Sequence, residues 1–404
     1  MKGFSQRTDV EVVLAFIEQH AVPLASESVP LLAAAGRVLA ETVVAKVDVP
    51  GFARSAMDGF AVRGRDTFGA GGYDPISLEV LGVSLPGVPF PASVGPGQAV
   101  RIMTGAPLPT GADAVVMAEV CSESAGRVEV RDAVAPQKNV GARGEDVESG
   151  DRLLSPGRKL RPQDAGLLAS IGCAKVECVR RPRVALVVTG DELLPAGSAP
   201  DPQGAMIADS NSVVLRALVD RDGGECLPFE ILPDRPEAIR EAMADDAADV
   251  VLVSGGSSVG QEDHAPSLLA ELGSLDFHGV SMRPSSPTGL GRIAERFVFL
   301  LPGNPVSCLC AYEFFAGPTI RALGGLSRDW PHRRLRVPLI RKIASAVGRT
   351  DYVRVALEAG GARPIGTSGA SILSSTVRAD GFVIVKREWE GMPEGNEVEV
   401  LLYD

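Results

Sequence analysis

The chain has 404 residues, of which 45% are hydrophobic and 23% charged, with a formal net charge of −11. This length allows several domains, and the composition is typical of an ordered globular protein. The acidic balance argues against general binding to nucleic acid or to acidic membranes. The sequence contains neither a signal peptide nor a membrane-spanning apolar stretch, so we expect a cytoplasmic protein. None of the six cysteines forms a CxxC pair, which favours reduced structural thiols.

The first 180 residues alternate between helical and β-like patterns. An apolar repeat at helical spacing follows a capping box at residues 8–11. A second helix, with Pro early and Gly just beyond its end, is expected over residues 162–171. We expect these helices to join in one elongated helical domain of residues 1–50 and 143–180. Between them, short apolar runs separated by Gly- and Pro-rich turns predict an inserted β-barrel over residues 51–142.

Strand and helix patterns alternate in the next part of the chain, which predicts a doubly wound α/β domain over residues 181–326. Its apolar runs 184–188, 250–253 and 297–301 each end in a polar turn. Ligands of open α/β sheets bind outside the carboxyl ends of the strands, so these turns predict one shared crevice. Four later β-like runs predict a C-terminal β-barrel over residues 327–404.

The turn after residues 250–253 begins with Ser254, Gly255 and Gly256 and contains little side-chain bulk. Such a turn leaves backbone N–H groups free to surround an anion, although plain loop geometry is an alternative interpretation. The polar cluster Gln261-Glu262-Asp263-His264 closes this loop, and Asn304 followed by Pro305 forms a typical helix start at the same edge. The crevice is therefore predicted to bind an anionic ligand.

Six short motifs resemble, in the same order, those of the molybdopterin molybdenumtransferase family, the bacterial counterparts of the gephyrin E domain. They are Ser-Ala-Met-Asp58-Gly-Phe, Met-Thr104-Gly-Ala-Pro, Gly-Glu-Asp146, Thr-Gly-Asp191-Glu192-Leu, Ser254-Gly-Gly-Ser-Ser-Val-Gly and Leu-Pro302-Gly-Asn-Pro305-Val-Ser307. The likeness covers nearly the whole chain. It implies four domains and an elongated homodimer, in which the α/β domain of one subunit and the inserted region of the other share the active site.

The resemblance also implies a reaction. Adenylated molybdopterin and molybdate would be the substrates, and Mg²⁺ or another divalent cation would assist hydrolysis of the adenylate to AMP. Molybdenum would remain on the dithiolene as the molybdenum cofactor. Such chemistry needs backbone donors and carboxylates that hold a metal. Molybdopterin adenylyltransferase and molybdoenzyme apoproteins would be the partners before and after this step.

The site residues implied by the resemblance form four groups. The metal ligands would be Asp191, Glu192 and Asp263. The catalytic carboxylates would be Glu192, Asp234, Asp263, Asp58 and Asp146, the last two from the partner subunit. The substrate-binding residues would be Thr104 (also from the partner subunit), Thr189, Gly255, Gly256, Ser257, Ser258, Pro302, Asn304 and Pro305. The oxyanion-binding residues would be Arg283, Ser286, Ser307, Arg349 and Ser371. A helix N-cap is an equally good interpretation of Asp234.

The sequence departs from the family where molybdate should bind. The family usually has Lys-Pro-Gly-Lys-Pro, whereas this chain has Arg283-Pro-Ser-Ser286-Pro, and its residues 366–371 match the family's Gln- and Ser-bearing loop poorly. Ser286 supplies no positive charge, so we expect weaker attraction for an oxyanion unless Arg349 or Arg354 compensates. Two alternatives stay open: a carrier or maturation protein that binds a molybdopterin species without inserting metal, and a gephyrin-like dimeric scaffold.

Overall fold

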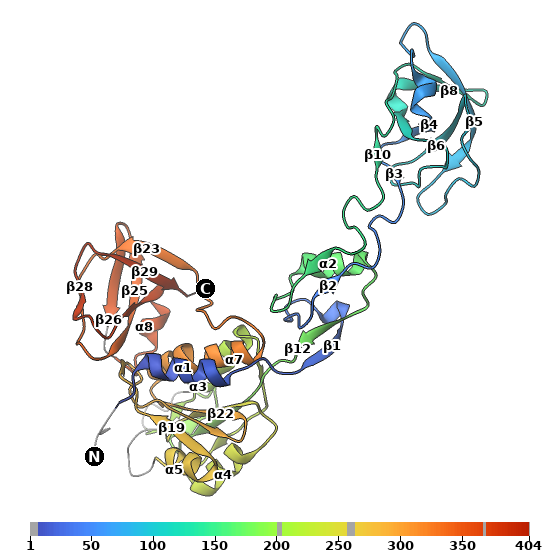
Figure 1. The fold of residues 1–404 in the computed structure, drawn as a ribbon. Coiled ribbons are helices and arrows are strands. Elements are labelled where there is room, and N and C mark those ends of the chain that lie inside the picture. Colours follow the sequence, from blue (N-terminus) through green and yellow to red (C-terminus); the bar gives the residue numbers. More distant parts are fainter. Residues whose placement is uncertain (1–6, 200–203, 257–262, 367–368, 404) are drawn as a thin grey trace.

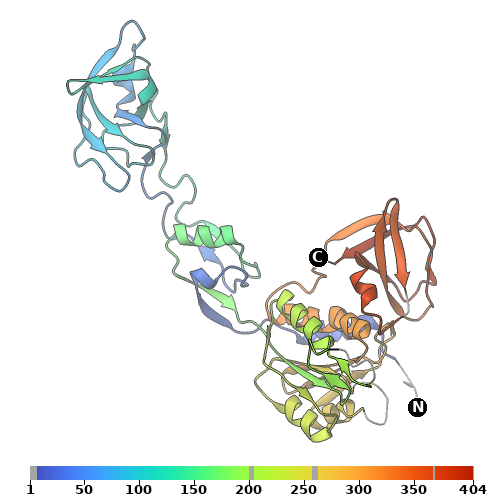
Figure 2. The same ribbon diagram turned by 180° about the vertical axis from the view of Figure 1, so that it is seen from behind.

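The structure, a computed structural model, describes residues 7–199, 204–256, 263–366 and 369–403. The molecule is long, with a β-rich domain at one end and a small domain in the middle (Figure 1). The α/β domain and a second β-rich domain lie together at the other end, and Figure 2 shows the same order from behind. The inserted region is thus far from the α/β domain of its own chain.

The α/β domain is built on a sheet with strand order β16-β13-β18-β22-β21-β19. Its central strands β13 (Arg183–Thr189), β18 (Val250–Ser254) and β22 (Arg296–Leu301) run parallel. β16 (Glu225–Cys226) and β17 (Ile231–Leu232) pair in parallel with β13, whereas β21 (Gly289–Ile293) and β19 (Ser274–His278) are antiparallel. The carboxyl ends of the three central strands therefore lie at one edge, as predicted.

Helices cover both faces of this sheet because alternate strand residues point to opposite sides. Val250 and Leu252 contact one apolar core, and Val251 and Val253 contact the other. The first face carries α1 (Val10–His20), α3 (Asn211–Arg221), α6 (Pro305–Ala311), the π-helix η4 (Tyr312–Ala316) and α7 (Gly317–Leu323). The second face carries α4 (Pro236–Ala244) and α5 (Ala265–Leu272). The doubly wound α/β prediction is confirmed.

The predicted pairing of the first helix with the helix near residue 162 is wrong. Val13 and Ile17 of α1 are buried in the core of the α/β domain, where they join Phe314 and Ile320. Asp9 makes no capping hydrogen bond and instead pairs with Arg387 of the C-terminal domain. The periodicity showed that this helix has one apolar face, but it did not indicate which core covers that face.

The middle domain is also less helical than predicted. It has its own apolar core. Its elements are β1 (Ser26–Pro30), η1 (Leu31–Ala33), β2 (Val43–Val44), β11 (Arg152–Leu154), α2 (Pro162–Ser170) and β12 (Lys175–Val179), with β1 paired to β12 and β2 to β11. The two strand pairs carry the chain out to the inserted domain and back. The residue bounds predicted for the four domains stay predictions.

Both β-rich domains contain the expected strands. The inserted domain has the order β7-β4-β6-β5-β9-β8, formed by Gly59–Val62 (β4), Ile76–Ser84 (β5), Gln98–Ile102 (β6), Ala114–Met117 (β7), Cys121–Ser124 (β8) and Arg127–Val130 (β9), with η2 (Gly64–Thr67) and η3 (Ala118–Val120). β3 (Arg54–Ser55) and β10 (Val140–Gly141) pair at its base.

The C-terminal sheet has the order β20-β25-β27-β29-β23, with β26 beside β25. Its strands are β20 (Met282–Arg283), β23 (Arg334–Pro338), β25 (Thr350–Glu358), β26 (Gly361–Gly366), β27 (Gly381–Val385) and β29 (Glu397–Leu402). β24 (Ile343–Ala344) pairs with β28 (Gly391–Met392), and α8 (Ser374–Val377) is short. Since β20 comes from within the α/β domain, this sheet joins the two domains.

All six cysteines are free thiols. Within the described residues, no helix is both long and apolar enough to cross a membrane.

Candidate active site

A cleft of about 610 Å³ lies at the carboxyl ends of β13, β18 and β22. Ten of the predicted site residues line it: Thr189, Glu192, Asp234, Gly255, Gly256, Asp263, Pro302, Asn304, Pro305 and Ser371. Ser257 and Ser258 lie outside the described residues. The turns of three separate strands therefore form one site, as their positions in the sequence predicted.

The first two glycines of the Ser254 turn are required by the backbone. Gly255 has φ +104° and Gly256 has φ +56°, both in the left-handed region. A Cβ atom on Gly255 would lie 2.2 Å from the carbonyl oxygen of Thr189. The turns that follow β13 and β18 thus approach each other closely, and only glycine at position 255 permits this approach.

Asp234 shapes the turn that follows β13. Its Oδ1 accepts a hydrogen bond from the Thr189 hydroxyl, and its Oδ2 accepts one from the Asp191 N–H at 3.3 Å. Asp191 Oδ1 in turn accepts a hydrogen bond from the Asp234 N–H at 3.2 Å. The N-cap of α4 is Arg235, so the alternative interpretation of Asp234 as a helix cap is wrong.

Glu192 and Asp263 are two of the four carboxylates that line the cleft, from the turns after β13 and β18 respectively, beside Asp209 and Asp234. Glu192 is exposed and Asp263 is half-buried. Among the described residues, no group of three or more His, Cys, Asp or Glu side chains is assembled for a metal ion. The metal assignment of Asp191, Glu192 and Asp263 stays a prediction.

Asn211 is a cleft residue that the sequence analysis missed. Its amide Nδ2 donates to Ser254 Oγ at 3.0 Å and to the Gly303 carbonyl oxygen at 2.8 Å. The side chain is buried and joins the turns after β18 and β22. In the sequence it is one polar residue at the start of a helix, so only the fold reveals its role.

The C-terminal domain supplies one wall of the cleft. The backbone N–H of Val306, in the first turn of α6, donates to the carbonyl oxygen of Ala370 at 2.9 Å. This bond holds the segment that contains Ser371 at the cleft. The free N–H groups expected at this helix start are therefore partly used by the barrel.

Two of the predicted oxyanion residues, Arg283 and Arg349, lie where β20 meets β25, whereas Ser307 lies in α6 and Ser371 lines the cleft. Arg283 forms an ion pair with Asp351, and Arg349 Nε lies 2.9 Å from Asp351 Oδ1. The Ser285 hydroxyl donates to the Ser307 carbonyl oxygen, which ties this loop to α6. Arg354 Nη2 donates to the Gly366 carbonyl oxygen at 3.2 Å. Both Arg283 and Arg349 are thus already engaged by a carboxylate.

The inserted domain holds a separate pair of predicted residues. The Thr104 N–H and hydroxyl both donate to Asp58 Oδ1 at 2.7 Å, and these hydrogen bonds lower the pKa of Asp58. Asp146 is exposed at the neck of the domain. Figures 1 and 2 show this domain at one end of the molecule and the α/β domain, which carries the cleft, at the other end. The structure therefore does not bring Asp58, Thr104 and Asp146 to the cleft within one chain.

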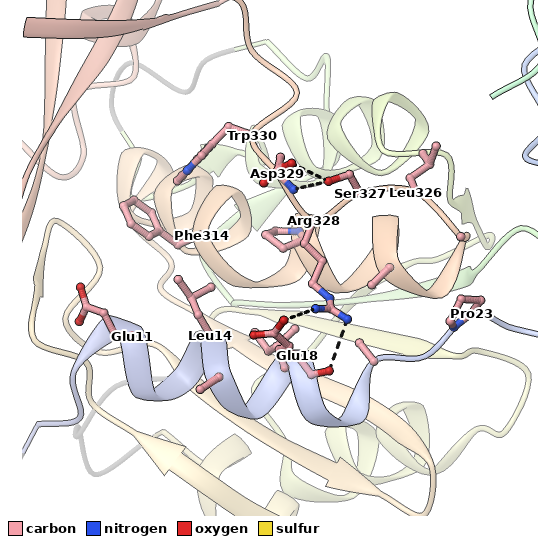
Figure 3. A pocket seen from close by; sticks show the side chains of 16 residues that line it. Glu11, Leu14, Glu18, Pro23, Phe314, Leu326, Ser327, Arg328, Asp329 and Trp330 are labelled. Atoms are coloured by element: carbon pink, nitrogen blue, oxygen red, sulfur yellow. Dashed lines mark hydrogen bonds and ion pairs between the residues drawn. The ribbon is translucent and has the colours of Figure 1, made fainter. Parts of the chain in front are cut away.

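A second cavity, of about 700 Å³, lies between α1 and residues 325–330 (Figure 3). Its apolar wall includes Leu14, Phe314 and Trp330, and Arg328 pairs with Glu18 at 3.1 Å. None of the six motifs contributes a residue to this cavity. The cleft at the strand ends is therefore the better candidate site.

Three protein-family profiles match the chain in order: the MoeA N-terminal region (domain I and II) over residues 8–172, "Probable molybdopterin binding domain" over 185–322, and the MoeA C-terminal region (domain IV) over 336–403. The molybdopterin molybdenumtransferase of Haemophilus influenzae is 33% identical over 395 residues, covering 95% of each chain. The protein of that name from a Nostoc species is 38% identical over 334 residues, covering 81% of this chain and 76% of the relative. A crystal structure of a molybdopterin biosynthesis MoeA protein from Pyrococcus horikoshii is 34% identical, with a TM-score of 0.85, over 99% of this chain and all of that chain.

Proposed function

Because the chain belongs to the molybdopterin molybdenumtransferase family, we propose that it inserts molybdenum from molybdate into adenylated molybdopterin, with hydrolysis of the adenylate and release of AMP. The enzyme is a transferase of molybdenum cofactor biosynthesis. The observation that carries the finer proposal is the convergence of three strand-end turns in one cleft with Glu192, Asp263 and Gly255.

The glycine turn is the proposed phosphate site. Gly255 and Gly256 keep side chains away from the backbone, so N–H groups of this turn can donate to phosphate oxygens. Hydrolysis of a phosphoanhydride depends on positioning and on neutralising charge more than on a covalent intermediate with the protein. This requirement fits a cleft that offers backbone donors and acidic side chains.

Mg²⁺ or another divalent cation is the proposed metal, held by Glu192, Asp263 and Asp191. Hard divalent cations prefer oxygen ligands, and carboxylates supply them. When bound, the ion would neutralise charge on the phosphate oxygens. Asp191 Oδ1 also accepts the Asp234 N–H, so this side chain is already oriented toward the turn.

A homodimer with shared sites is proposed because Asp58 and Thr104 form a polar pair in the inserted domain, and this domain lies at the opposite end of the molecule from the α/β domain. Asp58, Thr104 and Asp146 of one subunit would then complete the cleft of the other. The elongated shape supports such an arrangement, since two antiparallel copies could place each inserted domain near the partner's α/β domain. The shared site is consistent with the closed twofold symmetry of most homo-oligomers.

The proposed partners follow from the position of this reaction in molybdenum cofactor biosynthesis. A molybdopterin adenylyltransferase would supply the adenylate, and molybdoenzyme apoproteins would receive the finished cofactor. We propose that the supply of the adenylate and the delivery of the cofactor both take place in the cytoplasm.

Incubation of the purified protein with adenylated molybdopterin, Mg²⁺ and molybdate tests the proposal. AMP release and cofactor formation are measured separately, the latter by reconstitution of a molybdoenzyme apoprotein. We expect both products, and chelation of the divalent cation should stop AMP release. Tight binding of the adenylate without either product would instead support a carrier or maturation protein.

A further inference from the structure

We propose that Asp351 is an internal counter-ion that occupies Arg283 and Arg349 until an incoming tetrahedral oxyanion takes its place. This inference rests on the proposed function, in which molybdate is a substrate and Arg283 and Arg349 would bind it. It concerns how binding of the oxyanion at these two arginines is controlled. Asp351 is completely buried, with 0% of its surface exposed. A buried carboxylate between two arginines is placed where an anionic substrate would need the same two cations.

The backbone fixes this arrangement across two domains. β20 and β25 pair in parallel, with Met282 opposite Thr350 and Arg283 opposite Asp351. The Thr350 N–H also donates to the Ser281 carbonyl oxygen at 2.8 Å. Arg283 from the α/β domain and Asp351 from the C-terminal domain are therefore direct neighbours in one ladder. Asp351 is thus held beside these cations by the backbone.

The polar groups around Asp351 are incompletely satisfied. Within the described residues, four buried donor-capable atoms at this pair of strands or close to it in sequence have no hydrogen-bond partner. They are Arg283 Nε, Arg349 Nε and Thr350 Oγ1, which lie in or next to the β20–β25 pair, and Ser286 Oγ, three residues after Arg283. The 2.9 Å approach of Arg349 Nε to Asp351 Oδ1 lacks hydrogen-bond geometry. Buried polar groups normally have hydrogen-bond partners, so these unsatisfied donors need an explanation. A tetrahedral oxyanion offers acceptors in several directions, whereas one planar carboxylate does not.

The charges explain why Asp351 would matter for affinity. Two guanidinium groups and one carboxylate leave one net positive charge at this position. A dianion that enters while Asp351 remains paired would meet a carboxylate in a site with few other ions to screen it. Binding must therefore break the Asp351 ion pairs. Asp351 weakens oxyanion binding, and it stabilises the two half-buried cations when the oxyanion is absent.

The test compares wild type with Asp351→Asn in the absence of pterin. Thermal unfolding is measured with molybdate, tungstate or sulfate against chloride at equal ionic strength, and Kd values are measured by calorimetry. We expect the variant to unfold at a lower temperature than wild type in chloride. The oxyanions should raise its unfolding temperature more than they raise that of wild type, and it should bind molybdate about tenfold more tightly. An equal or smaller rise in unfolding temperature would overturn the proposal.

One control variant and the folding behaviour of Asp351→Asn keep the outcome clear. Asp380→Asn alters a carboxylate of the same domain that accepts the Leu357 N–H, and it should leave the oxyanion response unchanged. If Asp351→Asn is recovered folded only in molybdate, the proposal holds; a variant that no oxyanion rescues contradicts it. Because the measurement needs no adenylate, failure of AMP release would refute the proposed function without deciding this inference.

Discussion

Asp191 and Asp234 each accept a hydrogen bond from the other's backbone N–H, at 3.2 and 3.3 Å, across the turn that follows β13. The Thr189 hydroxyl uses the remaining oxygen of Asp234. Asp234 lines the cleft together with Glu192 and Asp263, and both of its carboxylate oxygens hold the turn. These hydrogen bonds give Asp234 a role in shaping the cleft.

Asp234→Ala should lower AMP release by roughly ten- to a hundredfold, because it removes a half-buried carboxylate that accepts two hydrogen bonds, and a hydrogen bond to a charged group contributes about 1.5–3 kcal/mol. Asp234→Asn keeps one acceptor and should retain more activity than the alanine variant. The measurement is single-turnover AMP release at saturating Mg²⁺. Glu237→Gln, on the neighbouring helix, is the matched control. If the alanine variant were as active as wild type, the turn would not depend on Asp234.

Glu192→Gln and Asp263→Asn should abolish AMP release and leave the fold intact, because each removes an anionic oxygen that a divalent cation needs. Both side chains lie outside the buried apolar cores, so the thermal unfolding curve should not change. A titration with Mn²⁺ in place of Mg²⁺, followed by electron paramagnetic resonance, would report metal binding independently. Full metal affinity together with normal AMP release would show that these carboxylates serve only the loop structure.

Mixing two inactive variants tests the shared site. Thr104→Ala alters the inserted domain, and Asp263→Asn alters the α/β domain, so a heterodimer of the two would contain one intact site. Random assembly of a homodimer should then restore about one quarter of the wild-type AMP release. Light scattering should report twice the chain mass for each protein. A fully active monomer, or no recovery on co-expression of the variants, would contradict the shared site.

The fold could be predicted where local sequence decides it. The apolar runs of β13, β18 and β22 indicated buried parallel strands, and their order placed the polar turns at one edge. The position of α1 could not be predicted, because an amphipathic pattern identifies a buried face but not the surface that covers it. The turns of the cleft were accordingly found, and the packing of the first helix was not.

Two residues of the candidate site show the same limit. Asn211 joins two turns that are far apart in the sequence, and Asp351 meets Arg283 across 68 positions of the chain. Both contacts depend on tertiary register, which neither composition nor spacing reveals. Arg349 was one of two arginines that could compensate for Ser286, and the structure shows that Asp351 engages it.

We expect the stability of the fold to depend on pH through the buried carboxylate of Glu313, which contacts His332. Burial raises the pKa of Glu313, but hydrogen bonds from His332 and Arg221 outweigh burial, so the pKa lies below its usual value. A lowered pKa stabilises the fold above the unfolded-state pKa of about 4.3, and this stability is lost as the pH falls through the folded-state pKa. Glu313→Gln should cost about 1.5–3 kcal/mol at pH 6, because Arg221 and His332 lose an ionised partner while Arg221 keeps its ion pair with Asp222.

The difference between wild type and Glu313→Gln should therefore shrink as the pH falls below about 5. Trp330 lies beside His332, with ring centroids 6.2 Å apart, so its fluorescence in a Trp389→Phe background reports unfolding of this region. Local measurement is needed because a multidomain chain rarely unfolds in one step. A difference that stays constant from pH 6 to pH 4 would show that Glu313 does not titrate with folding.

Ser286→Lys should lower the molybdate concentration that gives half-maximal insertion. Within the described residues, Ser286 Oγ is buried without a hydrogen-bond partner, three residues after Arg283, so an ammonium group there would add a cation to the loop that carries the proposed oxyanion site. A charge-assisted hydrogen bond contributes about 1.5–3 kcal/mol, which corresponds to a gain of about one to two powers of ten. Part of this gain would be lost if the lysine pairs with Asp351. Binding of the adenylate should change little, because the glycine turn is untouched.

Ser285→Ala, which loses the hydroxyl that donates to Ser307, is the neighbouring control and should not lower the molybdate requirement. An unchanged requirement in Ser286→Lys would show that the second cation of the family is not what limits oxyanion binding in this chain.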